Sequence, residues 1–217
     1  MRFAIAGEGR TDFIVLKNLL IGFLNDKNLA VTRLLPKDKE PVGWGNVLNY
    51  LSTEEFRIGA LNTDFVVVQI DTDKCEDWNV GLKNIGDNIS EVESFINAVI
   101  DMLKTKIGAD FYQPNESKIL FAITVHDIEC WLLPFNIHLS AKQAKIVGCY
   151  KALESVATKQ GFSLNQKNYE DGKHYETLAT EMKKNKILME KHSLNPSLKI
   201  FIEKLLVAFP GSAQKIP

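Results

Sequence analysis

Three short apolar runs, each followed at once by acidic residues, constrain the fold of this chain most. They occupy residues 2–6, 65–70 and 119–125 and are rich in Val, Ile and Phe. The middle run, FVVVQI, is nearly continuous in its apolar character, which is typical of a central strand covered on both faces. Apolar residues at helical spacing follow the first run and precede the third. Strand and helix in alternation predict an α/β fold with a mainly parallel sheet flanked by helices.

The rest of the chain adds one strand and several helices to this pattern. A strand is predicted near residues 29–35, and further helices near 44–56 and 90–106. Beyond residue 140 the pattern is helical, with helices predicted at about 142–160, 173–190 and 196–209. A chain of 217 residues can form one substantial core. We therefore expect an α/β core over residues 1–138 and a helical C-terminal section over 139–217 packed on it.

Composition and cysteine usage indicate an ordinary cytoplasmic protein. Hydrophobic residues make up 45% of the chain and charged residues 24%, the balance of a soluble globular domain. The first apolar segment is too short for a signal peptide or a membrane span, so we expect a cytoplasmic location and no membrane partner. Three cysteines without CxxC spacing predict reduced free thiols rather than a disulfide framework or a thiolate zinc site.

The overall charge is close to neutral. With 26 Lys and Arg against 27 Asp and Glu, the net charge is −1, so the chain lacks the basic footprint of most free-standing nucleic-acid binders. A site rich in carboxylates lowers the net charge by itself, and a bound Mg²⁺ reverses the local sign. Charge alone therefore does not exclude a nuclease.

Pairs of acids follow each of the three strands. The carboxyl ends of parallel strands meet at one edge of a sheet, where ligands bind in α/β folds. Carboxylates brought together there repel one another unless a cation joins them, and oxygen-only ligands favour Mg²⁺ or Mn²⁺. The pairs are Glu8 with Asp12, Asp71 with Asp73, and Asp127 with Glu129.

Three motifs in this order give the chain a resemblance to a known superfamily. They are EGRTD over residues 8–12, DTD over 71–73 and HDIECWLL over 126–133. Together they resemble the TOPRIM superfamily, and more narrowly the overcoming-lysogenization-defect (OLD) class of TOPRIM nucleases, including small stand-alone proteins. The resemblance covers roughly the first 135 residues. It implies a TOPRIM-like sheet and a metal-dependent endonuclease that hydrolyses nucleic-acid phosphodiesters.

The resemblance also implies roles for individual residues. Glu8, Asp71 and Glu129 would hold metal, while Asp12 and Asp73 would complete a second site or bind through water. Two ions clamp the attacking water and the leaving oxygen in such centres. OLD-type nucleases add a lysine from the C-terminal part, for which this sequence offers Lys173 in DGKHYETLA.

Partners follow from the same resemblance. The substrate is expected to be DNA rather than RNA, the setting prokaryotic defence against phage, and the companion a separately encoded ATPase. No GxxxxGK[ST] segment occurs in the chain, so the chain is not itself a P-loop ATPase.

Each acid also has a purely structural alternative. Glu8, Asp12 and Glu129 lie where helices begin, and acids favour that end of the helix dipole. Asp71 and Asp73 suit a turn after a strand. His126 and Asp127 are interpreted as supporting or capping residues, and Lys173 and His174 as part of a solvated helix face.

Three other functions compete with the nuclease. A dinucleotide-binding module is disfavoured because the third glycine of GxGxxG is absent and Asp12, in its place, would repel pyrophosphate. A different metal-dependent phosphoryl or glycosyl transfer enzyme would use DTD alone and dispense with Glu8. A non-catalytic TOPRIM-like module would bind a partner and show no nuclease turnover with any metal.

Overall fold

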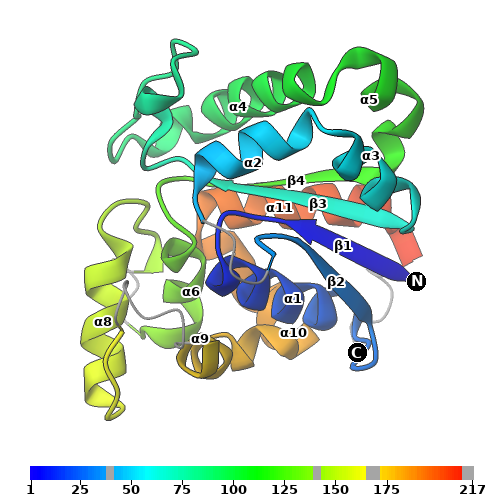
Figure 1. Ribbon diagram of the computed structural model, residues 1–217. Helices are drawn as coiled ribbons and strands as arrows, with labels where there is room; N and C mark the ends of the chain where they lie inside the picture. The colour runs from blue at the N-terminus through cyan, green and yellow to red at the C-terminus, as the bar shows by residue number, and fades with distance from the viewer. Residues whose placement is uncertain (38–41, 139–142, 165–171, 212–217) are drawn as a thin grey trace.

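The computed structural model describes residues 1–37, 42–138, 143–164 and 172–211. Its centre is a parallel four-stranded sheet in the order β2-β1-β3-β4 (Figure 1). The strands are β1 (Arg2–Ala6), β2 (Ala30–Leu35), β3 (Phe65–Asp71) and β4 (Ile119–Thr124). The predicted α/β class with a parallel sheet flanked by helices is therefore confirmed, in an arrangement consistent with a TOPRIM-like fold.

Helices cover both faces of the sheet (Figure 1). One face carries α2 (Trp44–Leu51), α3 (Glu54–Leu61), α4 (Val92–Ile107) and α5 (Ala109–Asn115). The other carries α1 (Arg10–Leu24), α6 (Glu129–Asn136), α8 (Cys149–Lys159), α9 (Gly172–Leu178), α10 (Asn185–Lys191) and α11 (Pro196–Ala208). The sheet is thus the middle of three layers.

Alternate residues of each strand enter two separate apolar clusters. Phe3 and Val67 belong to the cluster shared with α1 and α11, whereas Ala4 and Val66 belong to the cluster shared with α2 and α4. Side chains alternate across a strand, so a strand buried on both faces must be apolar throughout. This explains the continuous apolar run of residues 65–70.

Several predicted helices have different bounds in the structure. The helix expected over 44–56 is two helices, because the Thr53 side chain accepts a hydrogen bond from Phe56 N (3.2 Å) and starts α3 anew. Within the described part of 142–160, α8 begins only at Cys149, after Gly148 with φ +66°. The helix expected over 173–190 is divided into α9, a 3-10 turn at Thr180–Lys183 and α10. The helix expected at 196–209 is confirmed as α11.

The helices beyond residue 140 pack on the sheet layer. Helix α11 contacts β4 and α4, while α9 and α10 contact α1. Leu198 and Phe201 of α11 share one apolar cluster with Phe3 and Leu16. The domain boundary itself, at residues 138 and 139, stays a prediction. In the described ranges, no helix has the length and apolar character needed to cross a membrane.

Gly22 lies where α1 and the C-terminal section come into close contact. A Cβ built at this position would lie 1.9 Å from the backbone oxygen of Met182. Asn185 adds hydrogen bonds from Nδ2 to the carbonyl oxygens of Gly22 (2.9 Å) and Phe23 (3.1 Å). Only a residue without a side chain allows this contact.

Candidate metal centre

The topology brings the acids to one end of the sheet. The chain runs from β1 outward to β2 and then returns to β3 on the other side of β1, and ligands of α/β folds bind at the carboxyl ends of strands at such a switch point. Glu8 follows β1, Asp71 ends β3, and Glu129 begins the helix after β4. The three strand ends expected to converge are therefore neighbours in the sheet.

Glu8 joins the ends of β1 and β3. Its Oε1 accepts a hydrogen bond from the backbone N–H of Asp71 (2.8 Å), and its own N–H donates to Gln69 Oε1 (3.1 Å). A Cβ at Gly7 would lie 2.9 Å from that Gln69 oxygen, so this glycine leaves room for the contact. Burial, and then the charge of Asp12, raise the pKa of Glu8 to about 8.

Asp12 folds back over the start of α1. A Cβ at Gly9 would lie 2.6 Å from Asp12 Oδ2, so the glycine of EGRTD makes room for this carboxylate. Helix α1 begins at Arg10 with Gly9 as its N-cap. Asp12 is only 4% exposed. Burial, and then the charge of Glu129, raise the pKa of Asp12 to about 7. Asp12 therefore interacts electrostatically with the acid that follows β4.

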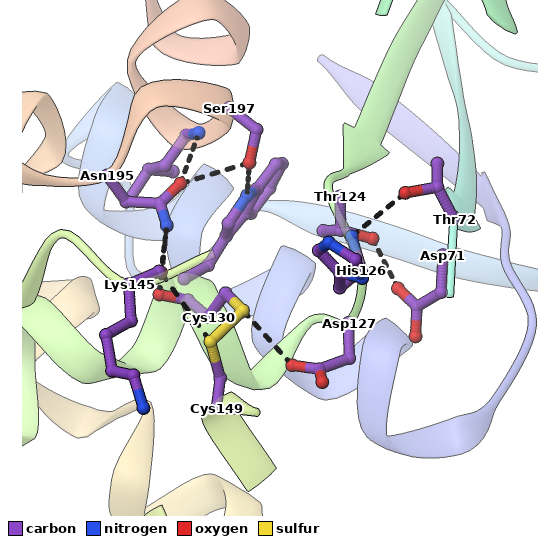
Figure 2. The surroundings of a disulfide bond; sticks show 12 residues. Asp71, Thr72, Thr124, His126, Asp127, Cys130, Lys145, Cys149, Asn195 and Ser197 are labelled. Atoms are coloured by element: carbon purple, nitrogen blue, oxygen red, sulfur yellow. Dashed lines mark hydrogen bonds between the residues drawn. A yellow bond between two sulfur atoms is a disulfide. The ribbon is translucent and has the colours of Figure 1, made fainter. Parts of the chain in front are cut away.

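Asp71 is oriented by two neighbouring side chains. Its Oδ1 accepts a hydrogen bond from Gln69 Nε2 (2.8 Å) and contacts the Thr124 hydroxyl at the end of β4 (Figure 2). Burial, followed by the charges of Asp12 and Glu8, raises the pKa of Asp71 well above its usual value. Gln69 and Thr124 were not identified from the sequence. Both lie at the carboxyl ends of strands, close to the acids. The alternation of side chains along a strand does not show which polar side chains there will hydrogen-bond an acid on the same or a neighbouring strand.

The loops after β3 and β4 hold each other in place. The backbone N–H of His126 donates to Thr72 Oγ1 (2.9 Å), and the N–H groups of Thr72 and Asp73 donate to His126 O (2.9 and 3.0 Å). His126 has φ +65°, and its Nε2 lies 2.8 Å from Gly86 O. The supporting role expected for His126 fits these contacts. Asp73 itself is exposed, but the surrounding protein partly desolvates its carboxyl and so raises its pKa.

Asp127 and Glu129 form the third part of the cluster. Burial, and then the charges of Glu129 and Asp73, raise the pKa of Asp127 to about 8, so Asp127 belongs with the other acids although it was expected only to support them. Glu129 is 9% exposed, and its Oε1 accepts a hydrogen bond from the Tyr175 hydroxyl. Burial raises the pKa of Glu129, and the Tyr175 bond opposes that rise.

The C-terminal section contributes Tyr175 to the centre rather than Lys173. Lys173 is exposed, and residues two apart on a helix do not share a face, so Tyr175 and Lys173 point in different directions. The catalytic role of Lys173 stays a prediction. The sequence contained one sign of this arrangement, because Tyr175 and Leu178 are spaced as one buried helix face.

The carboxylates have the donor atoms that a divalent metal prefers, but they are not spaced as closely as the ligands of a bound metal. Their donor atoms are all oxygen, which suits a hard divalent cation, and the strongest charges acting on Glu8, Asp12 and Asp71 are those of other carboxylates. Among the described residues, however, the one group with three ligand atoms within 4.8 Å is Asp127, Cys130 and Cys149. Oxygens of Glu8, Asp71 and Glu129 instead accept hydrogen bonds within the protein.

The prediction of three free thiols was wrong for two of them. Cys130 and Cys149 form a disulfide, and Cys75 is buried and free. The two bonded residues are 19 positions apart and match no spacing motif. Packing of α6 against α8 brings them together, and only the tertiary structure determines that contact.

Comparison of the chain with protein-family models, curated proteins and solved structures returned no match. The TOPRIM and OLD-like assignment therefore remains a resemblance that rests on three motifs and their order.

Stability without divalent metal is expected to fall as pH rises from about 5 to about 8. The pKa values of Glu8 and Asp12 are about 8 and about 7 in the folded chain, against 4.5 and 3.8 as ordinary values. A folded-state pKa above the unfolded one gives stability that is complete at low pH and is lost as pH rises through the folded value. Each such group contributes a slope of at most about 1.4 kcal/mol per pH unit.

Urea denaturation in EDTA at several pH values measures this slope. Glu8→Gln should make it shallower, whereas Asp64→Asn, at the exposed amino end of β3, should leave it unchanged. A free energy of unfolding that rises across the same range would contradict the expectation.

Proposed function

We propose that this chain is a Mg²⁺- or Mn²⁺-dependent nuclease that hydrolyses nucleic-acid phosphodiesters. The observation that supports this best is the gathering of carboxylates from three strand ends, where the charges of Glu8, Asp12 and Glu129 raise the pKa of neighbouring acids. A divalent cation would offset that repulsion. When bound, it would activate water and stabilise the charge of the phosphodiester. The proposed metal-holding residues are Glu8, Asp12, Asp71, Asp73 and Glu129.

The protein's own contribution is to orient these acids. The Asp71 N–H holds Glu8, Gln69 and the Thr124 hydroxyl hold Asp71, and Tyr175 holds Glu129. Hydrogen bonds that fix the direction of metal-binding groups typically raise metal affinity or activity about 10–100-fold. Gln69, Thr124 and Tyr175 are therefore positioning residues in this proposal.

The choice of substrate and partner rests on the resemblance to OLD-type nucleases. We propose DNA in preference to RNA, a cytoplasmic role in defence against phage, and cooperation with a separately encoded ATPase. Co-purification with candidate ATPases tests the last point, and a fully active nuclease that binds none of them would contradict it.

Cleavage assays test the proposed function directly. Plasmid DNA, single-stranded DNA and RNA are incubated with the chain in Mg²⁺, Mn²⁺ or EDTA. We expect cutting in either metal, none in EDTA, and loss of at least about a hundredfold in Asp71→Asn. The matched control is Asp64→Asn, the same substitution at the opposite end of β3, where the side chain pairs with Arg2. If the unmodified chain cuts none of these substrates in Mg²⁺ and none in Mn²⁺, the isolated chain is not a nuclease.

Tyr175→Phe is expected to weaken the centre without unfolding the chain. The variant removes one hydroxyl and leaves Glu129 buried without that donor, which should cost about 1–3 kcal/mol of stability and about 10–100-fold in metal affinity or cleavage. Mn²⁺ titration calorimetry and urea denaturation measure the two effects.

Tyr112→Phe provides the control for this substitution. Tyr112 also donates to a glutamate, Glu116 (3.4 Å), but at an exposed site on α5. Tyr112→Phe should therefore change stability and metal affinity little. Equal losses in the two variants would show that Tyr175 has no special role.

A further inference from the structure

We propose that reduction of the Cys130–Cys149 disulfide creates a Zn²⁺ site formed by Asp127, Cys130 and Cys149. One oxygen of Asp127 and the two sulfur atoms lie within 4.8 Å of one another. In the oxidised chain the sulfurs are bonded to each other, so they have no negative charge with which to bind metal. The proposed site therefore exists only in the reduced chain, and it does not depend on the proposed nuclease activity.

The spacing of the three ligand atoms suits tetrahedral zinc. Zinc–sulfur bonds of about 2.3 Å and zinc–oxygen bonds of about 2.1 Å place a sulfur and an oxygen ligand about 3.6 Å apart, and two sulfurs about 3.8 Å apart. Cys130 Sγ already lies 3.3 Å from Asp127 Oδ1 (Figure 2). The two sulfurs, bonded to each other in the oxidised chain, must separate to about 3.8 Å after reduction, by rotation of their short side chains.

Hydrogen bonds hold the segments that carry the ligands together independently of the disulfide. Asp127 and Cys130 belong to one turn, closed by a hydrogen bond from Cys130 N to Asp127 O (3.1 Å). The buried Asn195 side chain donates to the carbonyl oxygens of Cys130 and Lys145, both at 3.3 Å (Figure 2). Lys145 O in turn lies 3.6 Å from Cys149 Sγ. Asn195 therefore ties the segment before Cys149 to that of Cys130, and this tie remains when the sulfur bond breaks.

The ligand chemistry selects zinc over the metal proposed for the carboxylates. Thiolates prefer Zn²⁺, whereas all-oxygen sites prefer Mg²⁺ or Mn²⁺. Both cysteines lie in the first turn of a helix, α6 or α8, where backbone N–H groups favour anionic ligands. Asp127 is partly exposed, which gives the ion a route from solvent and leaves a fourth position for water, as three-ligand zinc sites have.

The chemical change balances with a small dithiol as the reductant. The Cys130–Cys149 bond breaks, two electrons and two protons pass from the dithiol, and the dithiol becomes a cyclic disulfide. Zn²⁺ then displaces the two thiol protons into solvent, with no change in the oxidation state of the metal.

Zinc titration of the reduced and oxidised forms of the full chain tests the proposal. After the dithiol is removed without oxygen, a chelating dye reports competition for Zn²⁺, and Co²⁺ reports thiolate ligation through its charge-transfer absorption. We expect about one thiolate-bound ion per reduced chain and none per oxidised chain. Excess Mg²⁺ should not displace this ion, and Glu8→Gln should retain it.

Variants separate the site from other thiols. Cys149→Ser should abolish the charge-transfer band and the tight binding, and Asp127→Asn should weaken binding more than about tenfold while both thiolates remain. Cys75→Ser, at the other buried cysteine, is the control and should bind as the unmodified chain does. Absence of zinc from the reduced chain, equal binding by the oxidised chain, or full affinity in Cys149→Ser would overturn the proposal. The comparison of redox forms uses the unmodified chain, so it holds even if a variant folds poorly.

Discussion

Glu8→Gln is expected to lower metal-dependent cleavage at least about a hundredfold and to leave the fold intact. Glu8 is the acid that follows β1, and its Oε1 accepts the 2.8 Å hydrogen bond from Asp71 N. Glutamine has the same shape and can accept that bond through its amide oxygen, but it lacks the charge that binds a cation. Because loss of a group that only orients a metal ligand already costs about 10–100-fold, loss of a ligand should cost more.

The fold should tolerate this substitution for an electrostatic reason. Burial and the charge of Asp12 raise the pKa of Glu8 to about 8, so the carboxyl is largely neutral near pH 7 when no metal is bound. Glutamine imitates that neutral form. Urea denaturation in EDTA should therefore show an equal or larger free energy of unfolding for Glu8→Gln than for the unmodified chain.

The same variant distinguishes the proposal from its main rival. A phosphoryl or glycosyl transfer enzyme that relies on Asp71 and Asp73 alone would keep its activity in Glu8→Gln and lose it in Asp71→Asn. Parallel loss in both variants supports a centre shared between β1 and β3. Retained cleavage in Glu8→Gln would remove Glu8 from the proposed metal ligands.

Gly22→Ala is expected to destabilise the chain by about 3 kcal/mol or more. The added Cβ would lie 1.9 Å from the backbone oxygen of Met182, and a backbone atom cannot rotate away as a side chain can. Helix α1 must shift from the C-terminal section, which also strains the Asn185 hydrogen bonds to Gly22 and Phe23. Overpacking of this kind costs about 1–3 kcal/mol even where side chains can adjust. For a chain of this size, about 3 kcal/mol lowers the melting temperature by roughly 6–12 °C.

Gly45→Ala is the matched control for this prediction. Gly45 also lies in a helix, α2, but a Cβ there would meet nothing within 4 Å. Alanine favours the helix over glycine by up to about 1 kcal/mol, so this variant should be neutral or more stable. Thermal and urea denaturation of both variants provide the comparison. Similar stabilities for the two would show that α1 has room to move at Gly22.

The sequence by itself determined the sheet layer and most of the acids in the candidate centre. The apolar run over residues 65–70 indicated a strand buried on both faces, and strand–helix alternation indicated parallel pairing. Once pairing is parallel, the residues that follow each strand must meet at one edge. The placement of Glu8, Asp71 and Glu129 at one edge of the sheet therefore followed from local patterns, whereas the strand order that makes their strands neighbours was decided by the tertiary structure. The helix expected over 196–209 likewise formed as α11, where the Asn195 side chain accepts a hydrogen bond from Leu198 N (3.0 Å).

Only the tertiary structure decided which distant side chains complete the centre. Tyr175 reaches Glu129 across 46 positions and Cys149 bonds to Cys130 across 19, whereas Lys173, chosen from the sequence, remains exposed. Such contacts depend on how α6, α8 and α9 pack, and side-chain packing leaves no periodic pattern in the chain. The division of the helix expected over 173–190 has the same origin, because α9 and α10 each dock on α1. Local periodicity specifies which face of an element is buried, but the partner of each buried polar group is selected by the packing of whole elements.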